Sequence, residues 1–310
     1  MSKFIIRRLL QFIPTIIIIS FVIFVLINII PGDPVFLSGD TRRVMDTKTI
    51  ERIREKWGLN DPFYLRYGKY LGNLVKGDLG ISFQTNRQVS ELLKERIPVT
   101  LKLASITMLI AILGGVFLGF ISGMKQGSFL DLFCMIGAIT GRSVPSFWLG
   151  LMLIYLFSVK LNIFPSGGYG GGNIIYLILP AFTLGIGYMA LIARVTRASV
   201  LDVRNEDYIR TARSKGLSEF VIRYKHIFKN ALIPVITIIG LQFGGLIAAT
   251  VVIEKVFSLP GIGSLLIQSI YRRDVALVQG CILLIIFSFL IINFVIDILY
   301  AYIDPRIRYQ

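Results

Sequence analysis

Six long runs of apolar residues divide this chain, and each is free or nearly free of charged side chains. The runs are residues 9–30, 103–123, 130–159, 174–193, 231–253 and 281–303. Each reaches the roughly 20 residues that a helix needs to cross a hydrocarbon core of about 30 Å. Only helices are plausible for these crossings, because lipid offers no hydrogen-bond partners to open backbone groups. We therefore expect an all-α polytopic membrane protein with six transmembrane helices.

The composition excludes a soluble domain, since 55% of the residues are hydrophobic and only 16% are charged. The formal net charge of +15 raises the possibility of nucleic-acid binding. The basic residues, however, are dispersed among the apolar runs and the loops, without a soluble basic patch interleaved with aromatic side chains. We therefore expect a lipid bilayer around the chain and no nucleic-acid partner.

Basic residues gather before the first apolar run and in the loop between the fourth and fifth runs. The positive-inside rule places both regions in the cytoplasm. The segment 31–98 is also basic, but its acidic residues nearly balance its bases and it is longer than the loops to which the rule applies. We place this segment outside the cytoplasm.

The predicted organisation has four parts. The basic start and the first apolar run lack a small-residue cleavage site, so residues 1–30 are interpreted as a retained transmembrane helix. A small extracytoplasmic lobe (31–98), a five-helix core (99–303) and a cytoplasmic tail (304–310) follow. The core includes a cytoplasmic loop (194–230) and an extracytoplasmic segment (254–280).

The cytoplasmic loop contains a short charged segment with helix signals. Asn205 is a suitable N-cap, Glu206 and Asp207 suit the positive end of the helix dipole, and Lys215 followed by Gly216 suits the exit. These signals predict a helix of roughly three turns. A simpler interpretation is that the loop is basic only because it obeys the positive-inside rule.

The predicted short helix has two kinds of surface. Ile209, Ala212 and Gly216 recur at a spacing that places them on one shallow face, which we interpret as a docking surface rather than part of a core. Arg210 and Arg213 project elsewhere, as does Lys215.

The third apolar run is interrupted by the sequence RSVPS, which places Arg142, Ser143, Pro145 and Ser146 deep in the membrane region. An intramembrane arginine normally faces the interior of the bundle or an aqueous path. These four residues are therefore candidates for a translocation path or gate. Alternatively, Arg142 caps carbonyl groups that Pro145 leaves without a donor.

Glycines recur every four residues in the second run, at Gly115, Gly119 and Gly123. This spacing allows helices to approach closely in lipid, so we expect a packing role. Cys134 and Cys281 lie in apolar runs without CxxC spacing and are interpreted as buried hydrophobic residues, with no disulfide or metal implied.

Nothing in the sequence indicates catalysis. The glycine-rich stretch 166–172 is not followed by GKS or GKT and therefore lacks the features of a phosphate-binding loop. The single histidine, His226, lies in the charged loop, and no nucleophile–base pair or metal cluster is visible. We expect a chain that is not an enzyme.

The short helix and the proline that follows it resemble a known motif. Thr211, Ala212, Gly216 and the later Ile233–Pro234 pair are similar to the EAA loop of ABC importer permeases, whose coupling helix docks in a groove of an ATPase subunit. Arg210 stands at the glutamate position and Thr211 at the first alanine position, and extra residues precede the proline.

These departures resemble those of one subgroup, the dipeptide, oligopeptide and nickel permeases, which use an RTARSKG-like form (210–216 here). Other motifs of that subgroup follow in order over nearly the whole chain. They are PGDP at 31–34, GDLGISF at 77–83, VPSFWLG at 144–150, VFSLPGIG at 256–263 and DPRIRY at 304–309. The chain is most similar to the B-type subunit of dipeptide and oligopeptide permeases.

The resemblance implies a type I ABC importer permease fold and the import of dipeptides or oligopeptides delivered by an extracytoplasmic binding protein. It also implies a homologous C-type permease partner, two cytoplasmic ATPase subunits that bind the ATP and Mg, and no cofactor on this chain. The location would be a prokaryotic cytoplasmic membrane, with both termini in the cytoplasm. The residues assigned to the ATPase-coupling helix are Glu206, Asp207, Ile209, Arg210, Thr211, Ala212, Arg213, Lys215 and Gly216.

Three alternatives remain for the function. A nickel or glutathione permease of the same group is possible, although a nickel path would be expected to offer His or Met clusters that the apolar runs lack. An ion-coupled secondary transporter should show inverted repeats and midplane acids, and only Asp297 comes near that pattern.

Overall fold

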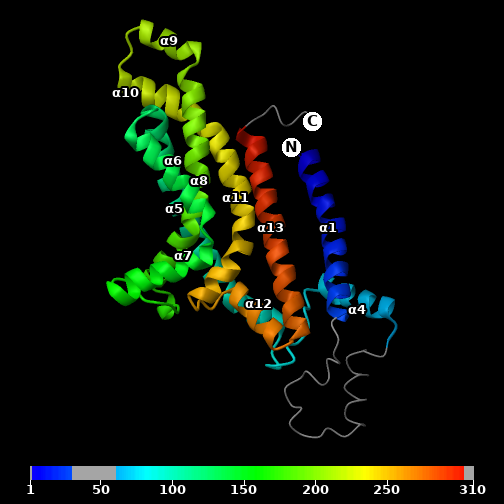
Figure 1. Ribbon diagram of the computed structural model, residues 1–310. Helices are drawn as coiled ribbons and strands as arrows, with labels where there is room; N and C mark the ends of the chain where they lie inside the picture. The colour runs from blue at the N-terminus through cyan, green and yellow to red at the C-terminus, as the bar shows by residue number, and fades with distance from the viewer. Residues whose placement is uncertain (1, 30–60, 304–310) are drawn as a thin grey trace.

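The computed structural model describes residues 2–29 and 61–303 (Figure 1). Within these ranges the regular structure is helical, apart from one isolated bridge between Ile81 and Gln88. This confirms the all-α prediction. Residues 31–60 of the predicted lobe (31–98), the predicted tail at 304–310 and the PGDP and DPRIRY motifs lie outside the described residues.

The long helices run roughly side by side, and short helices lie at both ends of the bundle that they form (Figure 1). We call these the α9 end and the α12 end, after the helices found there. The first residues of α1 and the last residues of α13 both lie toward the α9 end. The helices are α1 (Ser2–Ile29), α4 (Phe63–Val75), α5 (Val89–Met124), α6 (Phe129–Ser143), α7 (Ser146–Leu153), α8 (Ile175–Arg204), α9 (Asp207–Ser214), α10 (Glu219–Val221), α11 (Lys229–Val256), α12 (Ile262–Tyr271) and α13 (Val275–Ile303).

Three short segments complete the regular structure. A π-helical turn, η1 (Ile154–Lys160), continues α7, and a second, η3 (Ile222–Phe228), joins α10 to α11. A 3₁₀ turn, η2 (Gly170–Gly172), precedes α8. Because α10, η3 and α11 follow without a break, they form a 38-residue helix from Glu219 to Val256.

Four described helices are long and apolar enough to cross a membrane: Val89–Met124, Ile175–Arg204, Glu219–Val256 and Val275–Ile298. The pair α6 and α7 with η1 adds a fifth if it counts as one span, although it bends by 106°. The apolar part of α1, Leu10–Leu26, is shorter. The predicted number of six crossings is therefore approximate.

The close packing of α5 on α8 explains the glycine spacing. A Cβ atom at Gly115 would lie 2.8 Å from Ile192 side-chain atoms, and one at Gly119 would clash with the Ala193 carbonyl. One turn further along, a Cβ at Gly123 would lie 2.7 Å from Val200. Contacts that advance together along both helices show that α5 and α8 run parallel. The predicted packing role is confirmed.

Helix α4 lies across the α12 end of α1 (Figure 1). The Phe24 ring packs against the rings of Phe63, Tyr67 and Tyr70, at centroid distances of 5.2, 5.4 and 5.6 Å. The hydroxyl groups of Ser20 and Tyr67 lie 3.1 Å apart. This aromatic cluster ties α1 to the segment that leads into α5.

Candidate functional site

The predicted charged helix exists as α9, but its boundaries differ from the prediction. Helix α8 continues to Arg204, and Asn205 closes it, since the Asn205 N–H donates to the Asp202 carbonyl at 3.2 Å. Helix α9 begins at Asp207 after Glu206 and has eight residues, which is about two turns. The prediction that Asn205 caps a three-turn helix was therefore wrong.

The apolar face of α9 lies inside the chain. Ile209 and Ala212 are buried, at 0% and 6% exposure, against a cluster formed with Val200, Ile222, Ile227 and Ala231. This corrects the interpretation of the face as a docking surface for another protein. The reason is that α9 turns back onto η3 and the end of α8, so its apolar side chains meet apolar side chains of the same chain.

Gly216 follows α9 and lies at the surface. Its φ of +76° is a left-handed conformation that favours glycine, and a Cβ atom there would meet nothing within 4 Å. Unlike Ile209 and Ala212, Gly216 remains accessible to another protein.

The charged residues of α9 and its neighbours face solvent in this chain, as predicted for Arg210, Arg213 and Lys215. The Arg213 Nε atom lies 2.9 Å from Glu219 Oε1, and Arg210 lies 3.6 Å from Asp207. The side chains of Glu206 and Thr211 are exposed as well, so α9 presents a charged outer surface above an apolar base.

The RSVPS interruption breaks the third span. Helix α6 ends at Ser143, and α7 begins at Ser146 with Pro145 as its N-cap. Val144 has an extended ψ of 127°, as expected for a residue that precedes proline. The Ser143 hydroxyl donates to the Ile139 carbonyl at 2.9 Å. The 106° bend therefore lies at the four predicted path residues.

Arg142 is exposed beside this bend, together with Ser143 and Pro145, whereas Ser146 is half-buried. Within the described part of the chain, the Arg142 side chain makes no hydrogen bond or ion pair. Arg142 therefore does not cap the carbonyl groups near Pro145, which was the alternative interpretation. An arginine in an apolar span requires a polar surrounding, and residues 2–29 and 61–303 do not supply one.

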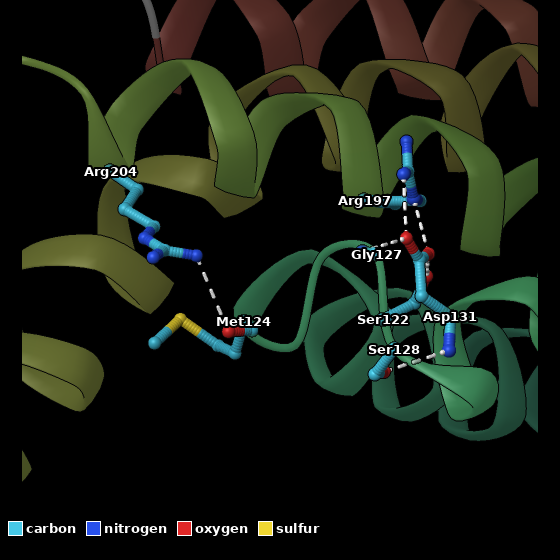
Figure 2. Close-up of polar contacts among 7 residues, drawn as sticks. All are labelled: Ser122, Met124, Gly127, Ser128, Asp131, Arg197 and Arg204. Atoms are coloured by element: carbon cyan, nitrogen blue, oxygen red, sulfur yellow. Dashed lines mark hydrogen bonds and ion pairs between the residues drawn. The ribbon is translucent and has the colours of Figure 1, made fainter.

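Sequence reasoning missed an ion pair between α6 and α8 (Figure 2). The Asp131 carboxylate accepts two hydrogen bonds from Arg197, at 2.6 and 2.8 Å. It also accepts hydrogen bonds from the Ser122 hydroxyl and from the Gly127 N–H, the latter at 3.0 Å. Asp131 is a single acid near the start of an apolar run, and that isolation was the available signal for a buried partner.

A second missed group is Glu254, which is fully buried near the end of α11. Its carboxylate accepts hydrogen bonds from the Thr100 hydroxyl at 2.6 Å and from the Ser264 N–H at 3.0 Å. Gly261 lies so close to this carboxylate that a Cβ atom there would clash with it. The LPGIG sequence therefore forms a turn built around Glu254.

The C-terminal end of α12 is fixed by Asp274, which is 1% exposed. Its carboxylate accepts a hydrogen bond from the Ser82 hydroxyl at 2.5 Å. The N–H groups of Phe83 and Gln84 lie 3.4 Å from its oxygens. The GDLGISF motif and the turn after α12 therefore lie together, although they are distant in the sequence.

Comparison with known proteins identifies the family. Residues 115–309 match the family described as binding-protein-dependent transport system inner membrane component, and residues 1–104 match the N-terminal part of such components. A putative peptide transport system permease protein of Brucella abortus (strain 2308) is 43% identical over 317 residues, covering 100% of both chains. The glutathione transport system permease protein GsiC of Escherichia coli (strain K12) is 42% identical over 310 residues, also with full coverage of both.

Solved structures support the fold. A structure of the MetNI methionine ABC transporter in an inward-facing conformation matches with a TM-score of 0.56 at 18% identity, covering 69% of this chain and 97% of that one. A chain of an amino acid ABC transporter with histidines matches with a TM-score of 0.53 at 19% identity, covering 70% and 94%. The architecture is thus the type I ABC importer permease fold. The chain belongs to the family of binding-protein-dependent transport system inner membrane components and is a permease of an ABC importer.

Proposed function

We propose that this permease imports dipeptides or oligopeptides that an extracytoplasmic binding protein delivers. Full-length relatives named as peptide and glutathione permeases support a small peptide as the cargo. In this proposal the chain pairs with a homologous C-type permease and two ATPase subunits, which bind the ATP and Mg. This chain itself binds no cofactor. Glutathione is the second candidate cargo.

The α9 end is proposed to face the cytoplasm of a prokaryotic cell, with both termini on that side. The support is the concentration of basic residues around α9 and the direction of α1 and α13 toward the same end. The α12 end then faces outward, with the described part of the predicted lobe and α12 beside it.

The single observation that carries the mechanism is that α9 is anchored to its own chain. Because Ile209 and Ala212 are buried in one cluster with Val200 and Ile227, α9 cannot move without moving α8 and η3. The exposed surface with Arg210, Arg213, Lys215 and Gly216 is proposed to contact the ATPase. Closure of the ATPase dimer would then displace α9, and the spans would switch between inward and outward openings.

Arg142, Ser143, Pro145 and Ser146 are proposed to line or shape the translocation path. The bend at Pro145 supports this role, since broken helices at membrane depth line polar cavities in transporters. The exposed Arg142 supports it as well, because either the path or the second permease could supply its polar surrounding.

The test is to purify the tagged chain with its membrane partners and to measure ATP hydrolysis. We expect an ATPase to co-purify, and we expect a binding protein loaded with peptide to stimulate it more than the empty binding protein does. Parallel assays with glutathione and with Ni²⁺ distinguish the cargoes. The absence of any co-purifying ATPase would contradict the proposal.

A further inference from the structure

Helix α6 is held along α8 at two points. At the α9 end, Arg197 of α8 forms the double hydrogen bond with Asp131. Toward the bend, Gly141 of α6 lies against Ile186 of α8, where a Cβ atom would be 2.7 Å from the Ile186 Cγ2 atom. The two contacts lie about 15 Å apart along α6, at 1.5 Å per residue. The two helices therefore pack antiparallel along most of α6.

The end of α6 near α9 is fixed to α8 by hydrogen bonds between charged groups, whereas the end at the bend contacts α8 through apolar packing. Asp131 is 7% exposed in its side chain, and Arg197 is 25% exposed. The Ser128 hydroxyl caps α6 by accepting from the Asp131 N–H at 3.2 Å. Figure 2 shows these side chains meeting at the turn between α5 and α6, where Arg204 also donates to the Met124 carbonyl at 3.4 Å.

The opposite end of α6 leads into the bend and has no ion pair to α8 among the described residues. Beyond Gly141, the chain reaches Arg142 and bends at Pro145, and the side chains of Arg142 and Ser143 are exposed. A force applied to α8 therefore reaches α6 through a charged, two-point hydrogen bond at one end. At the other end it reaches the bend through an ordinary side-chain contact.

We propose that the Asp131–Arg197 pair is the joint that carries motion of α8 to the α6–α7 bend. Arg197 lies two turns before the end of α8, and α9 begins three residues after that end. Displacement of α9 moves α8, and the bidentate pair makes α6 move with it, so the residues around Arg142 change position. Asp131 and Arg197 are positioning residues in this scheme and do not contact the cargo. The inference rests on the proposed function of α9.

The experiment uses the assembled transport complex with one reporter cysteine, Ser143→Cys, after Cys134→Ser and Cys281→Ala remove the native thiols. The rate of labelling by a water-soluble maleimide is measured with and without ATP. The joint is then altered by Asp131→Asn, which keeps the shape and removes the charge, or by Arg197→Lys, which keeps the charge and removes the two-point geometry.

Arg194→Lys is the matched control, since Arg194 is exposed on the same helix and forms no ion pair within the described residues. We expect ATP to change the labelling rate severalfold in the parent and in the Arg194→Lys complex. In Asp131→Asn and Arg197→Lys we expect that change to disappear while ATP hydrolysis continues and peptide uptake falls at least tenfold.

The outcomes separate this inference from the proposed function. If the parent complex lacks an ATPase, the proposed function fails. If it contains the ATPase and ATP leaves the labelling rate of the parent unchanged, the joint is overturned. If the parent responds and both joint variants respond equally, the joint is overturned and the proposed function stands. If both variants fail to assemble while Arg194→Lys assembles, the pair serves folding and the joint is likewise overturned.

Discussion

The Thr100 hydroxyl on α5 donates a 2.6 Å hydrogen bond to the buried Glu254 carboxylate on α11. The same hydroxyl accepts a hydrogen bond from the Ile262 N–H at 2.9 Å, and Glu254 accepts another from the Ser264 N–H at 3.0 Å. A carboxylate at the start of a helix is also favoured by the helix dipole. One carboxylate therefore holds the start of α12 against two spans.

Replacing Glu254 tests this arrangement. Glu254→Ala leaves the Ser264 N–H and the Thr100 hydroxyl without their acceptor, at about 1–3 kcal/mol for each buried group. We expect a clear fall in the melting temperature of the purified protein, and a smaller fall for Glu254→Gln, whose amide oxygen still accepts. Glu91→Ala is the control, because Glu91 is an exposed acid 3.9 Å from Arg87. Equal melting temperatures for Glu254→Ala and Glu91→Ala would contradict the role of this carboxylate.

Gly119→Leu should disrupt the contact between α5 and α8. The side chain would have to enter the space of the Ala193 backbone carbonyl, which cannot move aside as a flexible side chain can. Overpacking of this kind costs about 1–3 kcal/mol or more, so we expect a lower melting temperature and a lower yield of folded protein. Gly137→Leu on α6 is the control, since a Cβ there meets nothing within 4 Å. A variant at Gly119 as stable as the one at Gly137 would show that the helices do not pack this closely.

Gly216→Phe should uncouple ATP hydrolysis from transport. The site is open within this chain, so a bulky side chain would interfere mainly with a protein that docks there. We expect peptide uptake to fall at least tenfold while the complex still hydrolyses ATP. Gly77→Phe is matched in conformation, with the same φ of +76° and the same open space. Gly77 is the first residue of the GDLGISF motif and lies away from the α9 end, so its variant should transport normally.

A further variant separates strain from bulk at this position. Asparagine tolerates a positive φ better than other residues with a side chain, so Gly216→Asn should retain more uptake than Gly216→Phe. Normal peptide uptake in Gly216→Phe would refute the docking role of Gly216.

Cysteines at Ser143 and Ser146 should react with water-soluble thiol reagents in at least one nucleotide state. The reason is that the proposed path must be hydrated to accept Arg142 and a peptide. Phe133→Cys, which points from a different face of α6, is the control and should remain unreactive in lipid. Both native cysteines are replaced first. If Ser143→Cys and Ser146→Cys resist modification in every nucleotide state, these residues do not line a path.

Local patterns in the sequence predicted the helical spans, the glycine contacts and the position of the short charged helix. Hydropathy and four-residue spacing are local signals, and lipid leaves little choice of secondary structure. The burial of Ile209 and Ala212 was not predictable in this way. An apolar stripe on a short helix looks the same whether its partner is the same chain or another protein.

The buried carboxylates and their hydrogen-bond partners were missed for a related reason. Asp131 and Arg197 are 66 residues apart, and Thr100 and Glu254 are 154 apart. Each acid alone looked like an isolated charge at the edge of an apolar run. Only the three-dimensional packing of α5, α6, α8 and α11 brings the partners together.

We propose that this permease imports peptides with energy from ATP that its partner ATPase subunits hydrolyse. The most direct measurement is uptake of a radiolabelled dipeptide or oligopeptide into proteoliposomes that contain the purified complex, with the binding protein outside and ATP enclosed. We predict accumulation that requires both the binding protein and hydrolysable ATP and that stops with a non-hydrolysable analogue. Uptake that continues without ATP and follows an imposed proton or sodium gradient would show that the protein is not an ATP-driven peptide importer, as would transport of Ni²⁺ in place of peptide.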